Sequence, residues 1–200
     1  MRYPREHKDR VRQRIVAAAS RRFRSRGSEN VAIADLMGEL RLTHGGFYRH
    51  FKGKEHLFNE AFLAAAGQVQ SRMKAVAEQA SPGHELDAII THYLSAGHCE
   101  NPSHGCPIAA LAAEIARHPK RTRATLDRAV RQNASGVARF MPGNSAADRE
   151  RIAIVLFASM AGTVMLARAT ADETIRRDIL ETARTFYLKS FSRSTRAASS

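Results

Sequence analysis

Apolar residues return every three or four positions along most of the chain, and this period decides what the chain can fold into. In the N-terminal segment the apolar stripe runs through Val11, Ile15, Ala19 and Phe23 and stops at Gly27. Residues three or four apart share one face of an α-helix, so the stripe predicts a helix with one buried face. No segment shows the sustained alternation of apolar and polar residues that marks a β-strand. The sequence therefore predicts an all-α fold.

The same period predicts about nine helices in two domains. After the first helix, we expect helices at about 33–40, 43–51, 55–80, 84–98, 107–117, 119–139, 146–169 and 172–191. Segments rich in Gly and Pro, such as residues 81–83, separate them. We expect a three-helix N-terminal domain over residues 1–55, a larger helical domain over 56–191 and a flexible tail over 192–200.

The charge of the chain points to a polyanion as partner. The sequence has 32 Lys and Arg against 19 Asp and Glu, a net charge of +13, with a pI near 10.8. Residues 1–62 hold 14 of the basic and 7 of the acidic residues, so the excess is densest in the first third. A chain this basic is typical of nucleic-acid-binding proteins. A second basic cluster over residues 117–139 is interpreted as a solvated helix face.

The sequence predicts a cytoplasmic protein without membrane contact. No uninterrupted apolar stretch reaches the length of about 18 residues that a membrane span needs. The N-terminal residues include no apolar segment of a signal peptide. Two cysteines, Cys99 and Cys106, are too few for a disulfide framework.

The segment 43–51 has the composition of a DNA-reading helix. Phe47 and Phe51 are four apart and are expected to face the core. The outward positions carry donors, acceptors and one aromatic ring: Thr43, His44, Gly45, Tyr48, Arg49 and His50. Gly45 and Gly46 each cost about 1 kcal/mol in helix propensity, which favours a site where the backbone closely approaches a ligand such as DNA. With the helix expected before it, this segment predicts a helix-turn-helix.

Residues 10–60 contain five motifs in order: Ile-Val-Ala-Ala-Ala at 15–19, Phe-Arg-Ser-Arg-Gly at 23–27, Ile-Ala-Asp-Leu-Met at 33–37, Leu-Thr-His-Gly-Gly-Phe-Tyr-Arg-His-Phe at 42–51 and Lys-Glu-His-Leu at 54–57. With these motifs the segment resembles the TetR (TetR/AcrR) family of bacterial transcriptional regulators. The resemblance implies base and phosphate contacts from Thr43, Gly45, Tyr48 and His50, and a phosphate contact from Lys54 at the start of the fourth helix. It also implies that the larger domain binds a ligand and forms the dimer.

Two positions depart from the pattern of that family. Arg41 stands in the helix-turn-helix turn, where the family usually has glycine. A non-glycine residue with positive φ costs about 1 kcal/mol or more, so Arg41 either strains the turn or adds a phosphate contact. Val31 and Ala32 stand where the family favours Ser or Thr, so the second helix lacks an N-cap hydroxyl.

The helix expected at 146–169 is apolar on nearly every face and must be buried all round. In so small a domain, the extra partner is a second subunit. Ala158 and Gly162 would let another helix approach, and the last helix offers further apolar residues from Ile175 to Tyr187. We therefore expect a homodimer that reads a palindromic double-stranded DNA operator, with half-sites about 34 Å apart or a multiple of this.

Cys106 is a candidate thiol sensor. It precedes Pro107, which is typical of the first helical position, so Cys106 is expected at an N-cap, where the helix dipole favours a thiolate. The Gly105-Cys106-Pro107 string is similar to a branch of the TetR family in which some members sense electrophiles or oxidants through a cysteine at this place. Cys99 is the candidate resolving thiol. The alternative is a small buried cysteine that packs under the helix.

A metal site is the third interpretation of this segment. His98, Cys99, His104 and Cys106 are ligand types that zinc accepts. Their spacing matches no established zinc motif, so we expect no metal.

The resemblance implies a ligand- or redox-responsive repressor that a small-molecule inducer or an electrophile releases from DNA. Met73, Tyr93, Phe157 and Met160 are the candidate pocket residues. One alternative is an enzyme that pairs Cys106 with a histidine as nucleophile and base. No oxyanion-hole motif or Gly-rich phosphate loop accompanies that pair, so we expect no enzyme and no cofactor. A sequence-non-specific DNA-binding protein, supported by charge alone, is the other alternative.

Overall fold

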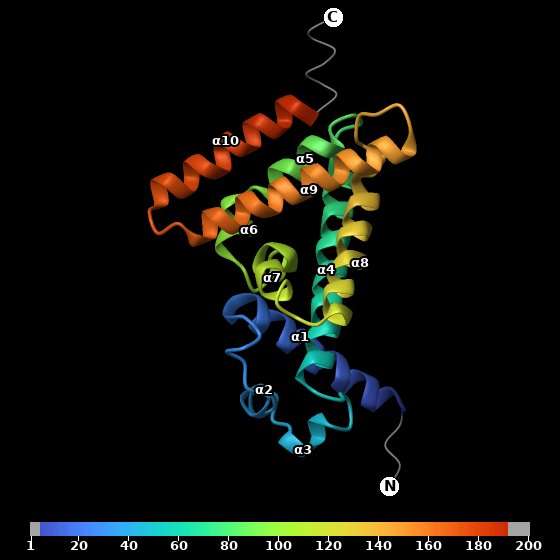
Figure 1. Ribbon diagram of the computed structural model, residues 1–200, viewed down its shortest axis with the longest axis vertical. Coiled ribbons are helices and arrows are strands. Elements are labelled where there is room, and N and C mark those ends of the chain that lie inside the picture. Colours follow the sequence, from blue (N-terminus) through green and yellow to red (C-terminus); the bar gives the residue numbers. More distant parts are fainter. Residues whose placement is uncertain (1–4, 192–200) are drawn as a thin grey trace, which may run out of the picture.

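The computed structural model describes residues 5–191, which form ten α-helices and no strand, and it confirms the all-α fold (Figure 1). The predicted tail over 192–200 lies outside the described residues. The helices are α1 (Arg5–Arg26), α2 (Ile33–Glu39), α3 (His44–Phe47), α4 (Lys54–Gln79), α5 (Glu85–Tyr93), α6 (Ala96–Glu100), α7 (Pro107–Ile115), α8 (Lys120–Ala138), α9 (Ala146–Ala169) and α10 (Glu173–Phe191).

The first three helices form one end of the molecule, and α3 lies at its extremity (Figure 1). Helix α4 starts at that end, packs on α1 and runs on beside α8 into the larger part. Helix α9 crosses α4 and α8, and α10 packs along α9. The predicted boundary between residues 55 and 56 falls in the first turn of α4, so one continuous helix is shared by both parts.

The N-terminal core is built from the predicted apolar stripe. Ile15 and Phe23 of α1 are 0% and 1% exposed, and Gly27 ends the helix with φ of 76°. Phe47 and Phe51 are both buried, and their stacked rings lie 5.4 Å apart. The two predicted inward positions of the recognition segment are therefore confirmed, and burial of such aromatic side chains stabilises the domain by about 1.5–3 kcal/mol each.

The helix predicted over 84–98 is two helices, α5 and α6. The helix is interrupted at Leu94, which caps the end of α5. The Ser95 hydroxyl caps the start of α6 by accepting a hydrogen bond from the His98 backbone N–H at 3.2 Å. Serine favours such a cap over a helix interior because its hydroxyl satisfies a free backbone amide. The apolar period continues across the break, so periodicity alone could not locate it.

The recognition helix is shorter than the predicted 43–51. Helix α3 ends at Phe47, and the next residues form a tight turn in which Arg49 and His50 donate backbone hydrogen bonds to the carbonyls three residues before them. Bonds with this spacing wind the backbone more tightly than an α-helix. Gly45 and Gly46 supply little helix propensity to hold a longer α-helix here.

Arg41 has a positive φ of 57°, the only non-glycine residue in this region among the described residues. It follows the C-cap of α2, and its N–H donates to the Gly38 carbonyl at 2.9 Å. Glycine is the usual residue at this position because it adopts positive φ without strain. Ala32 caps the start of α2 without a side-chain hydrogen bond, as the sequence predicted.

Replacing Arg41 by glycine is expected to stabilise the protein by about 1 kcal/mol, because the backbone strain of the left-handed conformation is removed. Urea unfolding followed by circular dichroism measures the change. Arg41→Ala, which keeps a Cβ at this φ, is the matched control and is expected to give no comparable gain. Equal stability of the two variants would show that the turn carries no strain.

Candidate nucleic-acid interface and ligand cavity

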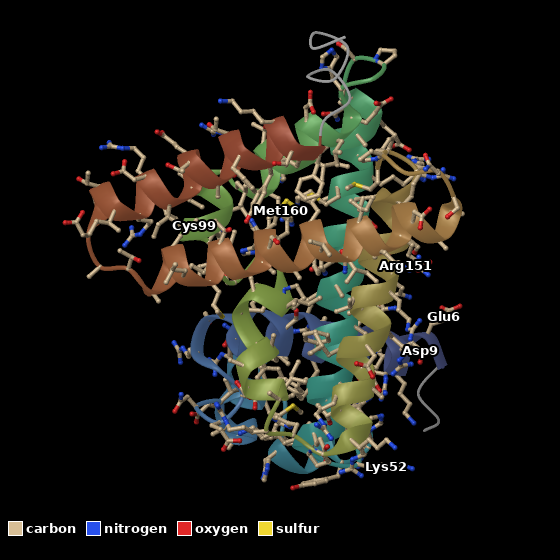
Figure 2. All side chains as sticks on the ribbon, turned by 45° about the horizontal axis from the view of Figure 1, so that its top comes forward. Glu6, Asp9, Lys52, Cys99, Arg151 and Met160 are labelled. Atoms are coloured by element: carbon tan, nitrogen blue, oxygen red, sulfur yellow. The ribbon has the colours of Figure 1, made fainter. Side chains whose placement is uncertain are left out.

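The predicted DNA-binding residues lie between the end of α2 and the start of α4. Six of them are exposed, namely Arg41, Thr43, His44, Gly45, Tyr48 and Arg49, while His50 and Lys54 are half-buried. Tyr48 is 64% exposed although it follows the buried Phe47, so a large aromatic ring faces solvent at the end of the molecule. Lys52 projects from the same end (Figure 2). This surface presents hydrogen-bond donors, cations and an aromatic ring together, which suits base edges and phosphates.

Thr43 has a structural role that the sequence did not reveal. Its Oγ1 accepts a hydrogen bond from the Gly46 backbone N–H at 3.3 Å and so caps α3. A Cβ at Gly46 would lie only 3.2 Å from that oxygen, so the absence of a side chain at Gly46 leaves room for the capping hydroxyl. A Cβ at Gly45 would meet nothing within 4 Å. Packing inside the chain therefore does not explain Gly45, and the space beside it is open to a partner.

Arg12 of α1 fixes the end of the recognition segment. Its guanidinium donates to the His50 carbonyl, forms an ion pair with Glu60 of α4 and lies 4.5 Å from the Phe51 ring centroid. Burial, followed by the charges of Lys8, Arg12 and Arg49, lowers the pKa of His50. The role of Arg12 could not be predicted from the sequence, because its partners lie far away along the chain.

Lys54 is the first residue of α4, and its Nζ donates to the Glu29 carbonyl at 3.4 Å. The Lys52 backbone N–H donates to His56 Nδ1 at 3.1 Å. The side chain of Lys54 thus crosses from α4 toward the turn before α2, beside the surface that includes Tyr48 and Arg49.

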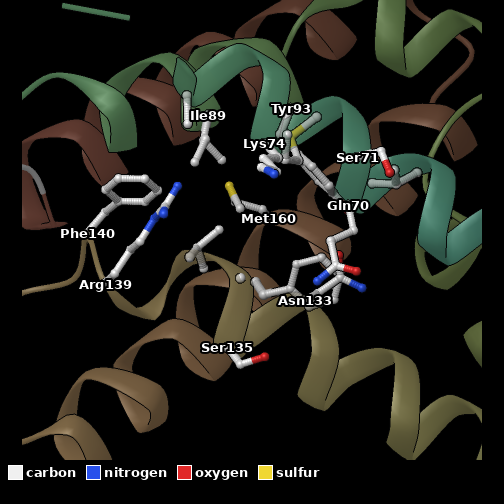
Figure 3. A pocket seen from close by; sticks show the side chains of 16 residues that line it. Gln70, Ser71, Lys74, Ile89, Tyr93, Asn133, Ser135, Arg139, Phe140 and Met160 are labelled. Carbon is white, nitrogen blue, oxygen red and sulfur yellow. The ribbon is translucent and has the colours of Figure 1, made fainter. Parts of the chain in front are cut away.

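A cavity of about 390 Å³ lies in the larger part, between α4, α5, α8 and α9 (Figure 3). All four predicted pocket residues, Met73, Tyr93, Phe157 and Met160, line it. Its charged lining residues are the cations Lys74 and Arg139. The volume and the mixture of apolar walls with a few polar groups are typical of small-molecule sites.

Cys106 is the N-cap of α7 with Pro107 at the first helical position, as predicted. The cysteines are free and buried, with Cys99 2% and Cys106 1% exposed. The Cys106 backbone N–H donates to His98 Nε2 at 2.9 Å, so His98 Nδ1 carries the proton and donates to the Tyr93 carbonyl. Burial is the main cause that lowers the pKa of His98 to about 4, and the ring is neutral at neutral pH.

Two buried donors near Cys106, the Tyr93 hydroxyl and Arg168 Nη1, make no hydrogen bond of good geometry among the described residues, although the Tyr93 hydroxyl lies beside the Cys106 side chain. Burial, followed by the nearby Cys106, raises the pKa of Tyr93 well above its ordinary value. Burial lowers the pKa of Arg168, and Cys99 and Cys106 act in the opposite direction. Unsatisfied buried donors are uncommon and favour an acceptor at this place.

No metal site forms from these residues. Within residues 5–191, no three His, Cys, Asp or Glu side chains gather into a group that could hold a metal ion. The alternative interpretation of His98, Cys99, His104 and Cys106 as zinc ligands therefore finds no such group among the described residues.

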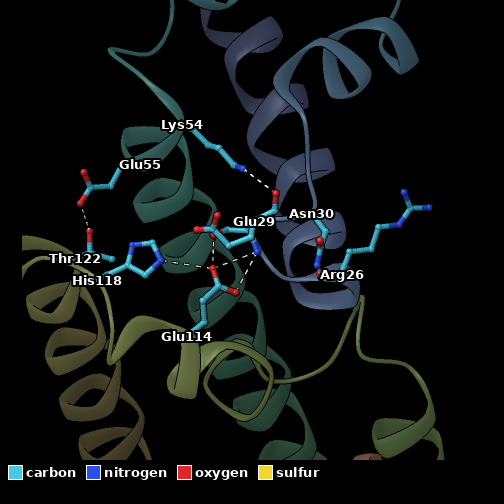
Figure 4. A network of polar contacts seen from close by, with 9 residues as sticks. Arg26, Glu29, Asn30, Lys54, Glu55, Glu114, His118 and Thr122 are labelled. Carbon is cyan, nitrogen blue, oxygen red and sulfur yellow. Dashed lines mark hydrogen bonds and ion pairs between the residues drawn. The ribbon is translucent and has the colours of Figure 1, made fainter.

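Two polar networks tie α7 and α8 to the N-terminal end (Figure 4). The Glu114 carboxylate of α7 accepts from the Ser28 backbone N–H at 3.1 Å and from its hydroxyl, and lies 3.5 Å from His118 Nε2. The Glu55 carboxylate of α4 accepts from Arg121 Nε at 3.0 Å and from Thr122 Oγ1 at 2.7 Å. The hydrogen bonds from Arg121 and then Thr122 lower the pKa of Glu55 to about 2.

Helix α9 is long and apolar enough to cross a membrane by length and composition alone. Seven of its residues are buried within this protein: Ala153, Leu156, Phe157, Met160, Ala161, Val164 and Ala167. Its other face is an exposed apolar surface shared with α10, made of Ile154, Val155, Met165, Leu166, Ile175 and Phe186. An exposed apolar surface of this kind marks an interaction site.

Two family models match the chain. The model described as bacterial regulatory proteins, tetR family, matches residues 15–61, and the one described as tetracyclin repressor-like, C-terminal domain, matches residues 82–183. An HTH-type transcriptional regulator of Mycobacterium tuberculosis is 28% identical over 171 residues, which are 82% of this chain and 87% of that protein.

Solved structures share the fold. A TetR transcriptional regulator from Chloroflexus aurantiacus is 25% identical with a TM-score of 0.76, and the match covers 94% of this chain and 98% of that chain. A TetR-family regulator from Cytophaga hutchinsonii is 21% identical with a TM-score of 0.77, covering 94% of this chain and 97% of that chain.

Stability is expected to fall between pH 6.5 and pH 4 because of His98. Its pKa is about 4 in the fold against 6.5 for a free imidazole, so the unfolded chain takes up the proton first. The contribution is complete above pH 6.5 and is lost as the pH falls, by at most about 1.4 kcal/mol per unit. Urea unfolding at pH 7, 6 and 5 measures it. His98→Gln is expected to flatten this slope, and an unchanged slope in the variant would contradict the assignment.

Proposed function

Because the chain belongs to the TetR family of bacterial transcriptional regulators, we propose that it is a repressor that binds a palindromic operator as a homodimer. A small molecule in the cavity of the larger domain releases it. The observation that carries the proposal is the exposed surface from Arg41 to Arg49 at the end of the molecule, on a helix-turn-helix whose inward residues Phe47 and Phe51 are buried. Members of this family are typically not enzymes, and we infer a cytoplasmic regulator without catalysis.

The DNA contacts are proposed residue by residue. Tyr48, His44 and the backbone at Gly45 approach the bases and sugars, since all three are exposed on α3 or directly after it. Arg41, Arg49 and Lys54 are placed against phosphates, which guanidinium and ammonium groups bind. Thr43 and His50 sit at the two ends of the segment and orient it through the α3 cap and the Arg12 contact.

A second copy of the chain is proposed to cover the exposed apolar surface of α9 and α10. Val155 and Leu166 are each 57% exposed and Phe186 is 61% exposed. A Cβ at Gly162 would meet nothing within 4 Å, which leaves room for a partner helix. A two-fold axis through this surface pairs two recognition helices, as two half-sites require.

The cavity and the DNA-binding end are proposed to communicate through α4, α7 and α8. Helices α4 and α8 both line the cavity, and at their N-terminal ends Glu55 bonds Arg121 and Thr122. A ligand that binds one spacing of α4 and α8 better than another shifts the population toward that spacing. The shift changes the separation of the two recognition helices and so weakens binding to fixed half-sites.

The Gly105-Cys106-Pro107 motif supports a second input, in which Cys106 is a thiol sensor of the Gly-Cys-Pro branch and Cys99 its resolving partner. The specific support is the Tyr93 hydroxyl, which lies beside the Cys106 side chain, and the unpartnered Arg168 Nη1, two donors suited to an anionic sulfur. Cys106 starts α7, and Glu114 of the same helix holds Ser28. Modification at one end of α7 therefore reaches the DNA-binding domain at the other. The packed-cysteine alternative predicts no such response.

Tyr48→Ala and Arg49→Gln are each expected to lower operator affinity about tenfold or more, through lost base and phosphate contacts. The operator is selected from random duplexes, and affinity is measured by fluorescence anisotropy across a salt series. Arg49→Gln is expected to reduce the salt slope by about one unit.

Arg177→Gln, which removes the same charge from exposed α10, is the matched control and is expected to bind like the wild type. Selected duplexes that share no palindrome, or complexes with one chain per site, would contradict the repressor proposal and favour a sequence-non-specific DNA-binding protein.

Alkylation with a quinone is expected to abolish operator binding by the wild type and by Cys99→Ser, but not by Cys106→Ser. The reason is that added bulk at the fully buried Cys106 cannot fit without moving α7. Mass spectrometry verifies complete modification, and thermal unfolding verifies that both variants fold. Unchanged DNA affinity of fully modified wild type would remove the sensor role and leave Cys106 as a packing residue.

A further inference from the structure

A second cavity, of about 540 Å³, lies where the DNA-binding domain meets the larger domain. We call it the junction cavity. Helices α1, α6, α7, α9 and α10 all contribute to its wall, and none of its residues lines the ligand cavity described above. Three of its lining residues are arginines from three helices, Arg24 of α1, Arg168 of α9 and Arg176 of α10.

These three arginines have no carboxylate partner among the described residues. Arg24 donates to the Gly105 carbonyl at 2.7 Å and to the carbonyl of its own helix, Arg168 donates to the Cys99 carbonyl at 2.9 Å, and Arg176 donates to the Thr170 carbonyl at 2.9 Å. No ion pair involves any of them within residues 5–191. Glu100 is the one acidic residue in the wall, and it is exposed.

Burial and a neighbouring positive charge both disfavour the charged form of Arg24. Arg24 is 5% exposed, and burial, followed by the nearby positive charge of Arg72, lowers its pKa to about 10. Buried charges in proteins are normally paired, because desolvation is costly and backbone carbonyls compensate only part of it. Three guanidinium groups facing one cavity with a single exposed carboxylate leave an excess of positive charge that an anion would neutralise.

We propose that the junction cavity binds a compact anion, a small carboxylate or phosphate compound held by Arg24, Arg168 and Arg176. Guanidinium groups recognise the oxygens of carboxylates and phosphates through paired N–H donors. Pro102, Ala109 and Ala110 contribute apolar groups to the same wall, which suits a short carbon skeleton. The volume accommodates a small metabolite.

The position of the junction cavity makes such an anion a second effector. Arg24 belongs to the first helix of the DNA-binding domain, whereas Arg168 and Arg176 belong to α9 and α10. An anion that touches all three joins the two domains, and Arg24 also holds the carbonyl of Gly105, the residue before Cys106. Binding therefore stabilises one placement of α1 against the larger domain, independently of the ligand cavity.

Isothermal titration calorimetry with citrate and with inorganic phosphate tests the proposal, at constant ionic strength and without DNA. One saturable site per chain is expected for at least one probe. Tighter binding of citrate would indicate a carboxylate ligand, and tighter binding of phosphate would indicate a phosphate compound. Arg176→Gln is expected to weaken that affinity about tenfold, the loss of one charge-assisted contact. Arg177→Gln removes the same charge one residue away, outside the junction cavity, and is expected to bind like the wild type.

Circular dichroism and thermal unfolding establish that both variants fold, and Arg168→Gln repeats the test from a second helix. Three results would overturn the proposal: no saturable binding of either probe, binding that survives in Arg176→Gln but is lost in Arg49→Gln, or a weakened dimer of Arg176→Gln without anion binding. Loss of binding in Arg49→Gln would place the anion on the DNA-binding surface. A weakened dimer of Arg176→Gln would assign the arginines to the subunit contact. Because DNA is absent, these outcomes are independent of operator binding.

Discussion

One unbroken helix, α4, connects the DNA-binding surface of this regulator with its ligand cavity, and the other helices are arranged around it. Helix α4 has 26 residues, which corresponds to about 39 Å. Its first turn holds Lys54 beside the recognition surface, and its second half, from Val69 to Ala77, forms a wall of the ligand cavity. A helix is stiff along its axis, so a change in its tilt at the cavity becomes a displacement at the DNA-binding end.

The polar contacts between the domains restrict the orientation of the DNA-binding domain more than the apolar packing does. Apolar packing between α1, α4 and α7 resists separation but tolerates small rotations, whereas a carboxylate that accepts two or more hydrogen bonds holds one orientation. Glu114 holds Ser28 after α1, and Glu55 holds Thr122 at the start of α8. The two carboxylates therefore help to fix how the DNA-binding domain is oriented, as does Arg24 through the Gly105 carbonyl, and the proposed population shift in the larger domain would act through such contacts.

Local features could be predicted from the sequence, and contacts between distant residues could not. The positive φ of Arg41, the N-cap at Cys106 and the inward faces of Phe47 and Phe51 depend on neighbours within a few positions, where propensity and period are informative. The four predicted pocket residues lie on apolar faces of helices that pack together in the larger domain. Arg12 with Glu60, and Glu114 with Ser28, are joined only by the tertiary fold, and their charges alone resemble ordinary surface residues.

The net charge of +13 has more than one use in the folded protein. The Lys and Arg residues of the cluster over 117–139 are exposed, which agrees with a solvated helix face, yet Arg121 holds Glu55 and Arg139 lines the ligand cavity. The arginines of the junction cavity are the opposite case, because Arg24 is buried and Arg168 and Arg176 are half-buried, without acidic partners among the described residues. Surface cations cost little to keep and serve solubility and attraction to DNA. Cations gathered at a domain junction carry a desolvation cost that backbone carbonyls offset only in part, so their position fits the proposed anion site better than attraction to DNA.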